Sequence, residues 1–126
     1  MGNETPRNII IREVVRGERN WRDLQKHSIG VDVAADAVRE ISVAEAPVKV
    51  FAHDVAHGWL RYAADERALR EWARFVHGAV GIVALELDDH PLGDALLDML
   101  WRATFNEPIT PDMERTVRRV LVTPAD

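Results

Sequence analysis

The sequence predicts a mostly α-helical α+β domain, with a helical body of about four main helices, two short N-terminal helices and a small β-hairpin. Three observations support this fold class. Segments of helical periodicity follow one another from residue 52 onward, a stretch of alternating apolar and polar residues precedes them, and 47% of the 126 residues are apolar. A chain of this length buries a sizeable core without crosslinks, so residues 1–126 are expected to form one domain.

The N-terminal part is expected to contain a tail and two short helices. Residues 1–8 are polar and predict a flexible tail. Apolar positions then recur at helical spacing over residues 9–16, a short helix that stops near Gly17. Asn20 is expected to cap a second short helix over residues 21–27, with an acidic residue three positions later as in a capping box.

A small β-structure is expected next. Apolar and polar residues alternate around a turn over residues 31–43, which predicts a β-hairpin. The segment Val48–Val50, directly after Pro47, is expected to add a third strand.

Four main helices are predicted in the rest of the chain, at 52–64, 66–80, 92–105 and 111–122. Their boundaries follow from capping residues and prolines. Asp65 is a candidate cap for the second helix, while Pro91 and Pro111 are expected to lie in the first turns of the third and fourth.

Composition restricts the classes of function. The chain has no cysteine, which excludes disulfides and thiolate chemistry. A net charge of −5 argues against a nucleic-acid partner, and no apolar run is long enough to span a membrane. The N-terminus has no apolar signal region, so a cytoplasmic location is expected. Only two of the sixteen basic residues are lysine, a bias typical of high-GC bacterial genomes.

One short motif is close to a zinc-binding signature. His53-Asp54-Val55-Ala56-His57 differs from H-E-x-x-H by one methylene, and His53 and His57 lie one helical turn apart. On a helical wheel both histidines and Asp54 lie opposite the apolar arc, which comprises Phe51, Val55, Ala56, Trp59, Tyr62 and Ala63. We therefore expect a solvated helix face with no metal and no cofactor. His53, Asp54 and His57 remain the candidate catalytic residues if the chain is an enzyme.

A catalytic zinc needs a third protein ligand, and nothing in the sequence fixes the distance of the available candidates (His77, Glu86 and His90). His77 lies at the edge of the apolar arc of its helix and is expected at the core boundary. His90, directly before Pro91, is expected to cap the following helix.

The third main helix carries two apolar faces. Its expected core positions are Leu92, Ala95, Leu96, Met99, Leu100 and Ala103. A second stripe, Leu97, Trp101 and Phe105, is spaced i, i+4, i+8 on the other side. A helix of this kind is either central in its fold or covered by another molecule, and the sequence leaves both alternatives open.

Carboxylates accompany the second stripe. Asp94 and Asp98 flank it along the helix, and Glu86, Asp88 and Asp89 lie just before the helix. A tryptophan surrounded by carboxylates suits the binding of a basic protein surface. Acidic residues at a helix N-terminus are, however, also favoured by the helix dipole alone.

A resemblance to a family adds to this interpretation. The segments Gly58-Trp59-Leu60-Arg61-Tyr62, Leu69–Phe75 and "ITPDMERTVRRVL", with an acidic helix before the last, resemble small acidic bacterial immunity-type proteins similar to the colicin D immunity family. The resemblance covers residues 50–122. It implies that the protein binds and neutralises a basic toxin through its acidic surface.

Two hypotheses of different class follow. The first is an immunity-like protein-binding module that uses an acidic face with an aromatic anchor and performs no catalysis. The second is a small homodimeric accessory or tailoring enzyme acting on a peptide or another small substrate. A homodimer is compatible with both.

Overall fold

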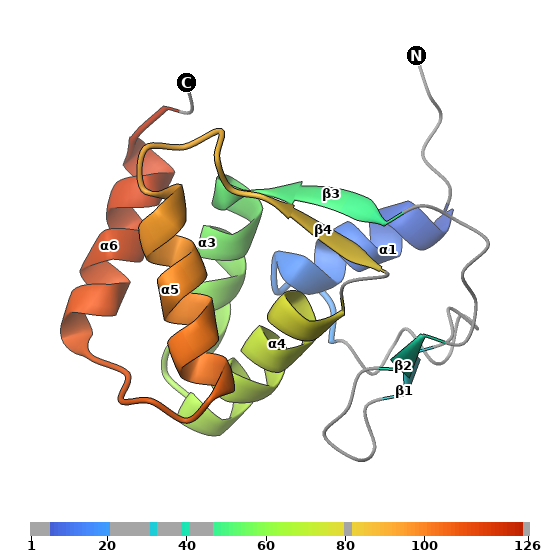
Figure 1. Ribbon diagram of the computed structural model, residues 1–126, viewed down its shortest axis with the longest axis horizontal. Coiled ribbons are helices and arrows are strands. Elements are labelled where there is room, and N and C mark those ends of the chain that lie inside the picture. Colours follow the sequence, from blue (N-terminus) through green and yellow to red (C-terminus); the bar gives the residue numbers. More distant parts are fainter. Residues whose placement is uncertain (1–5, 21–30, 33–38, 41–46, 80–81, 125–126) are drawn as a thin grey trace.

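The computed structural model describes residues 6–20, 31–32, 39–40, 47–79 and 82–124. Its helices are α1 (Pro6–Val15), α3 (Ala52–Tyr62), α4 (Glu66–Gly78), α5 (Gly93–Thr104) and α6 (Pro111–Val122). Its strands are β1 (Val31–Asp32), β2 (Arg39–Glu40), β3 (Val48–Phe51) and β4 (Val83–Glu86). The fold is mostly helical and broadly α+β, as the sequence predicts (Figure 1).

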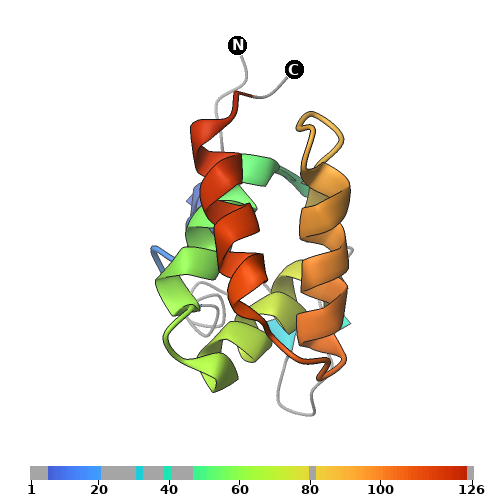
Figure 2. The same ribbon diagram turned by 90° about the vertical axis from the view of Figure 1, so that its left-hand side faces the viewer.

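Helix α3 is the centre of the helical body. It packs against α1, α4, α5 and α6, and α4 packs along α5. Figure 2 shows α5 and α6 standing side by side, so that one side of each faces away from the rest of the protein.

A two-stranded parallel sheet lies outside the segment predicted as a hairpin. Strand β3 pairs in parallel with β4, in a register that runs from Val48 opposite Val83 to Phe51 opposite Glu86. The strand predicted at 48–50 is confirmed as β3, but its partner is β4, which sequence reasoning missed. Its partner strand lies more than thirty residues earlier in the chain, so local sequence does not reveal the pairing.

Within the segment predicted as a hairpin, β1 and β2 pair antiparallel, with Val31 opposite Glu40 and Asp32 opposite Arg39. The other residues of that segment lie outside the described ranges, as does the predicted helix over 21–27.

Helix α1 starts earlier and ends where expected. It begins at Pro6, so residues 6–8 belong to the helix and not to the predicted tail, because proline is well tolerated in a first turn. It ends with Gly17 at φ 77°. The N–H of Gly17 donates to the Val14 carbonyl at 3.1 Å and that of Glu18 to the Glu13 carbonyl at 2.9 Å. This is the Schellman arrangement that a left-handed glycine permits.

The four main helices agree with the predicted segments to within two residues at each end. Asp65 caps α4 as predicted, accepting the Ala68 N–H at 3.2 Å. Pro111 is the first residue of α6, as expected. Pro91 was placed wrongly: α5 begins only at Gly93, and Pro91 lies in the preceding turn.

The core lies between the helices and the inner face of the β3–β4 sheet. Trp59 of α3 and Leu69 and Trp72 of α4 are each about 1% exposed, which confirms the core positions predicted for them. The Trp72 indole N–H donates to the Val15 carbonyl at 3.0 Å and so joins α4 to the end of α1. Phe51 was expected in the core but is 41% exposed, because it lies on the outer face of β3 rather than in α3.

Candidate functional site

Asp54 of the near-zinc motif has a structural role. It is only 7% exposed, so the prediction that it lies on a solvated face was wrong. Its Oδ2 accepts a hydrogen bond from the Phe51 N–H at 2.9 Å, at the start of α3. Its Oδ1 accepts a hydrogen bond from Arg16 Nη1 at 2.8 Å. This hydrogen bond is the main cause that raises the pKa of Arg16. Both carboxylate oxygens are occupied, so Asp54 is not positioned to act as a base toward a water held by the histidines.

The two histidines of the motif lie in different surroundings. His57 is exposed, as predicted, whereas His53 is half-buried and its ring packs edge-on against that of His90, with centroids 5.6 Å apart. Among the described residues, no group of three or more His, Cys, Asp or Glu side chains could hold a metal ion. The geometry therefore gives no support to the hypothesis of an enzyme that uses His53, Asp54 and His57.

His90 is buried and joins two helix ends. Its Nδ1 accepts a hydrogen bond from the Leu92 N–H at 2.9 Å in the turn before α5. The predicted capping role was wrong, because Leu92 is the N-cap residue of α5 and no side chain caps the helix. His90 Nε2 lies 3.0 Å from the Thr123 carbonyl at the end of α6. His77 is half-buried and contacts the Phe105 ring, in agreement with its predicted place at the core boundary.

The second apolar stripe of α5 lies on the surface. Leu97 is 43% exposed, Trp101 47% and Phe105 56%. The Trp101 and Phe105 ring centroids are 5.2 Å apart, so the two rings form one apolar patch. Leu96, Met99, Leu100 and Ala103 face the core as predicted, whereas Leu92 is half-buried and Ala95 is exposed, contrary to prediction. Of the two alternatives for the stripe, the internal one is excluded. We call Leu97, Trp101 and Phe105 the α5 stripe.

The end of α5 fixes the position of Phe105. Asn106 adopts φ 61°, and the Glu107 N–H donates to the Arg102 carbonyl at 2.8 Å. Asparagine tolerates this left-handed conformation better than most residues. The turn holds Phe105 between Trp101 and His77, whose ring centroids lie 5.2 and 6.3 Å from its own.

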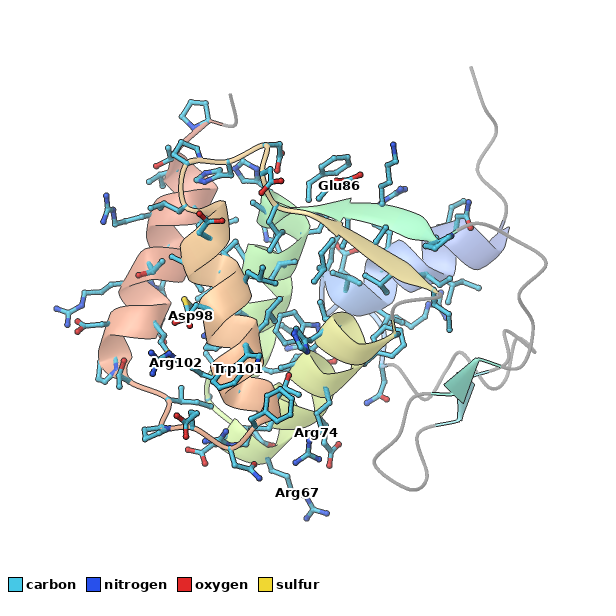
Figure 3. The ribbon with its side chains drawn as sticks, viewed as in Figure 1. Arg67, Arg74, Glu86, Asp98, Trp101 and Arg102 are labelled. Carbon is cyan, nitrogen blue, oxygen red and sulfur yellow. The ribbon has the colours of Figure 1, made fainter. Side chains whose placement is uncertain are left out.

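The five predicted carboxylates lie on α5 or before it. Glu86 is the last residue of β4, and Figure 3 shows it well away from Trp101 of α5. Asp88 is exposed and Asp89 half-buried in the loop that follows β4, and Asp89 Oδ1 is buried with no hydrogen-bond partner among the described residues. Only Asp94 and Asp98 lie on α5 itself. The acidic residues therefore gather toward the N-terminal end of α5.

Asp98 is paired within the helix. Its Oδ2 accepts Arg102 Nε at 2.7 Å, and this hydrogen bond is the main cause that raises the pKa of Arg102. Asp94 is exposed and has no ion-pair partner among the described residues.

Arginines of α4 lie beside the C-terminal end of the stripe, a feature that sequence reasoning missed. Arg70 donates to the Ala103 carbonyl at 3.1 Å and to the Glu107 carbonyl at 2.9 Å, which fixes α4 against this end of α5. Arg67 and Arg74 lie below Trp101 in Figure 3. A cavity of about 430 Å³ is lined there by Glu66, Arg67, Arg70, Glu71, Arg74 and Asn106. The charged residues on α4 show helical spacing in sequence, but only the packing of α4 on α5 brings them to Asn106, just after α5.

A second hollow lies between α1 and α3. It measures about 680 Å³ and is lined by Arg16, Gly17, Glu18, His57, Leu60 and Arg61. Arg16 is bound there to Asp54 and Glu18, so its charge is largely satisfied within the protein.

Comparisons of the chain with protein families, with curated proteins and with solved structures found no match. Over the residues that the structure describes, there is no helix with both the length and the apolar character required to cross a bilayer.

Proposed function

We propose that the protein is an immunity-like protein-binding module, and that its contact surface is centred on the α5 stripe. The observation that carries this proposal is the exposure of three large apolar side chains, between 43% and 56% each, side by side on one helix. Scattered apolar residues on a surface need no explanation, but a contiguous group with a tryptophan at its centre is typical of a binding anchor.

The proposed partner is a basic protein. The chain carries a net charge of −5, and Glu86, Asp88 and Asp94 are exposed at or before the N-terminal end of α5. Long-range attraction to this acidic end would speed the encounter with a basic partner, while Trp101 would supply buried apolar area after contact. The resemblance to immunity-type proteins implies that the partner is a toxin.

The α4 arginines near the C-terminal end of the α5 stripe further define the surface that the partner should have. A partner that covers the whole stripe meets carboxylates at one end and Arg67 and Arg74 of α4 at the other. Its own surface should therefore have an apolar pocket with basic side chains on one side and acidic or neutral side chains on the other, because like charges in contact oppose binding.

The proposal can be tested by photo-crosslinking in the native host. A photoreactive amino acid replaces Leu97 on the stripe and, as a matched control, Arg118 on the exposed face of α6, whose side chain is 64% exposed. We expect an adduct with a basic protein from position 97 and not from position 118. The crosslinked protein is identified by mass spectrometry, purified, and titrated with the unmodified chain by calorimetry.

Two variants complete the test with the purified partner. Trp101→Ala should weaken binding at least tenfold, because anchoring tryptophans commonly contribute more than one kcal/mol. The double variant Asp94→Lys with Asp98→Lys should slow association and flatten its salt dependence. Identical adducts from both crosslinking positions, or unchanged affinity in the Trp101 variant, would contradict the proposal.

A further inference from the structure

We infer that the hollow between α1 and α3 is a binding site for a small organic anion, whose carboxylate or phosphate head is held by Arg16 and Arg61. The inference goes beyond the proposed function, because this hollow shares no residue with the α5 stripe. Its volume of about 680 Å³ is typical of small-molecule sites. In a chain of net charge −5, the described residues that line it include Arg16, His57 and Arg61 but only one acid, Glu18.

The two walls of the hollow meet at a glycine. Gly17 adopts φ 77° at the end of α1, and a Cβ there would lie 2.6 Å from Arg61 Cβ and 3.3 Å from Gly58 Cα. The backbone of Gly17 therefore packs on the first side-chain carbons of Arg61. A side chain at position 17 would push α1 away from α3, so the base of the hollow depends on this close approach.

Arg16 supplies oriented donors from the α1 side. Its side chain is 31% exposed, and its Nη1 donates to the buried Asp54 carboxylate at 2.8 Å, which fixes the direction of the guanidinium. Its Nε donates to Glu18 Oε2 at 3.4 Å. A guanidinium has five N–H groups, and these two bonds use two of them. The other three have no partner among the described residues.

Arg61 supplies charge from the α3 side. The arginines Arg70, Arg102 and Arg118 of the other main helices each pair with a carboxylate four residues earlier in the same helix. For Arg61 that position is occupied by His57, which lies one turn earlier on the same face of α3. Both side chains are exposed, and neither has a hydrogen-bond or ion-pair partner among the described residues. The charge of Arg61 is therefore available to a ligand.

These groups match an oxyanion attached to an apolar body. A planar guanidinium donates two parallel N–H bonds to the oxygens of a carboxylate or a phosphate. Arg16 is already paired with Asp54 and Glu18, so Arg61 neutralises the ligand while Arg16 and His57 contribute hydrogen bonds. Leu60, which is half-buried, lines the same hollow and offers apolar surface. An organic anion therefore fits better than an inorganic ion.

Glu18 is the group that a bound anion would replace. Its bond to Arg16 Nε is long at 3.4 Å, and its side chain is 54% exposed. An ion pair of this kind contributes little to stability, because both charges are well solvated when they separate. The head of the ligand can therefore take the place of the Glu18 carboxylate without disturbing the bond between Arg16 and Asp54.

Titration of the purified protein with benzoate and with phenyl phosphate, followed by NMR, tests the site. The two compounds share a ring and differ in the head, so the tighter one identifies the preferred oxyanion. We expect dissociation constants in the millimolar range, because the site is open to water, with shifts of the backbone amides of Gly17, His57 and Arg61. Benzyl alcohol, which has the ring but no charge, should not bind.

Three variants test the assigned groups. Arg61→Gln should weaken the binding of both anions about tenfold or more, because hydrogen bonds to a charged donor are lost. Arg61→Lys keeps the charge without the planar fork and should bind with intermediate affinity. Glu18→Gln should strengthen binding by about threefold, since a competing carboxylate is removed. Circular dichroism checks that each variant is folded.

Arg119→Gln is the matched control. Arg119 is likewise exposed on a helix, α6, has no ion-pair partner among the described residues and does not line the hollow. Its loss should leave the affinity for both anions unchanged, although it changes the net charge by the same amount as Arg61→Gln.

The results can overturn the inference directly. Amides at the hollow that do not shift with either anion up to about 20 mM would exclude the site. Equal affinity in Arg61→Gln and the unmodified chain, or equal binding of benzyl alcohol, would show that no anion is recognised there. None of these titrations involves a protein partner, so a failure of the anion site leaves the crosslinking test at position 97 unaffected, and the converse also holds.

Discussion

Arg16 Nη1 donates to Asp54 Oδ1 at 2.8 Å, and this contact joins the end of α1 to the first turn of α3 across thirty-eight positions of sequence. The same carboxylate accepts the Phe51 N–H, so one buried side chain fixes both the start of α3 and its packing on α1. The acidic residue of the apparent zinc motif is thereby explained by folding alone.

Asp54→Asn should destabilise the protein by about 1–3 kcal/mol, because a buried acceptor loses hydrogen bonds to a charged donor and to the backbone. The hydrogen bond to Asp54 raises the pKa of Arg16, so the arginine is charged at every pH below its unfolded pKa. The contribution of this ion pair to the free energy of unfolding is therefore lost through Arg16 only in strongly alkaline solution, as the pH rises through the folded pKa. Urea unfolding at neutral pH measures the loss. Glu114→Gln, in the exposed α6 pair, is the control and should change stability by less than about 0.5 kcal/mol.

Chelation should not alter the melting temperature. Both oxygens of Asp54 and both ring nitrogens of His90 are already occupied by the fold, which leaves His53 and His57 without a complete ligand set among the described residues. Metal analysis of protein purified without chelator, followed by melts with and without chelator, checks this. Stoichiometric zinc together with a lowered melting temperature on chelation would show that the interpretation is wrong.

Trp72→Ala should cost about 3–5 kcal/mol, enough to unfold many domains of this size. The indole is about 1% exposed and its N–H donates to the Val15 carbonyl, so truncation leaves both a cavity and an unpaired buried acceptor. Trp72→Phe keeps most of the apolar volume and should cost less, but it still leaves that carbonyl unpaired. Denaturant titration followed by circular dichroism compares the two variants, and an unchanged midpoint in either would contradict the placement of Trp72.

Trp101→Ala should behave in the opposite way. Because Trp101 is 47% exposed at the surface, its truncation should lower the stability of the monomer by no more than about 1 kcal/mol. The measurement is made at low protein concentration, so that self-association does not contribute to the measured stability. Unfolding of this variant would mean that the tryptophan is internal, and the α5 stripe would no longer be an interface.

Gly58→Ala should destabilise the protein by about 1–3 kcal/mol or more. A Cβ at this position would lie 2.1 Å from the Val15 carbonyl oxygen and 2.4 Å from Trp72 Cζ2, so α1 and α4 would both have to move. Gly78→Ala provides the matched control, because a Cβ there meets nothing within 4 Å. At the end of α4 that change should be neutral or stabilising by up to about 1 kcal/mol. Thermal melts of both variants give the comparison.

The sequence predicted the helical body well because its signals are local. Asp65 and Thr110-Pro111 mark helix starts through groups that act within one turn, and the apolar periodicity of α4 correctly placed Leu69 and Trp72 in the core. The parallel pairing of β3 with β4 was missed, because a parallel partner is separated by a crossover and leaves no local pattern.

For the candidate site, the sequence by itself determined the composition of the α5 stripe and the position of its carboxylates along the chain, since i, i+4, i+8 spacing fixes one helix face. Whether that face is internal depends on where α3, α4 and α6 pack, and only the tertiary structure decided that it is exposed. Only the tertiary structure likewise shows that Asp54 is buried against Arg16. It also brings Arg67 and Arg74 of α4 toward the end of the stripe. A helical wheel records which residues share a face, but the neighbouring helices determine what each face meets.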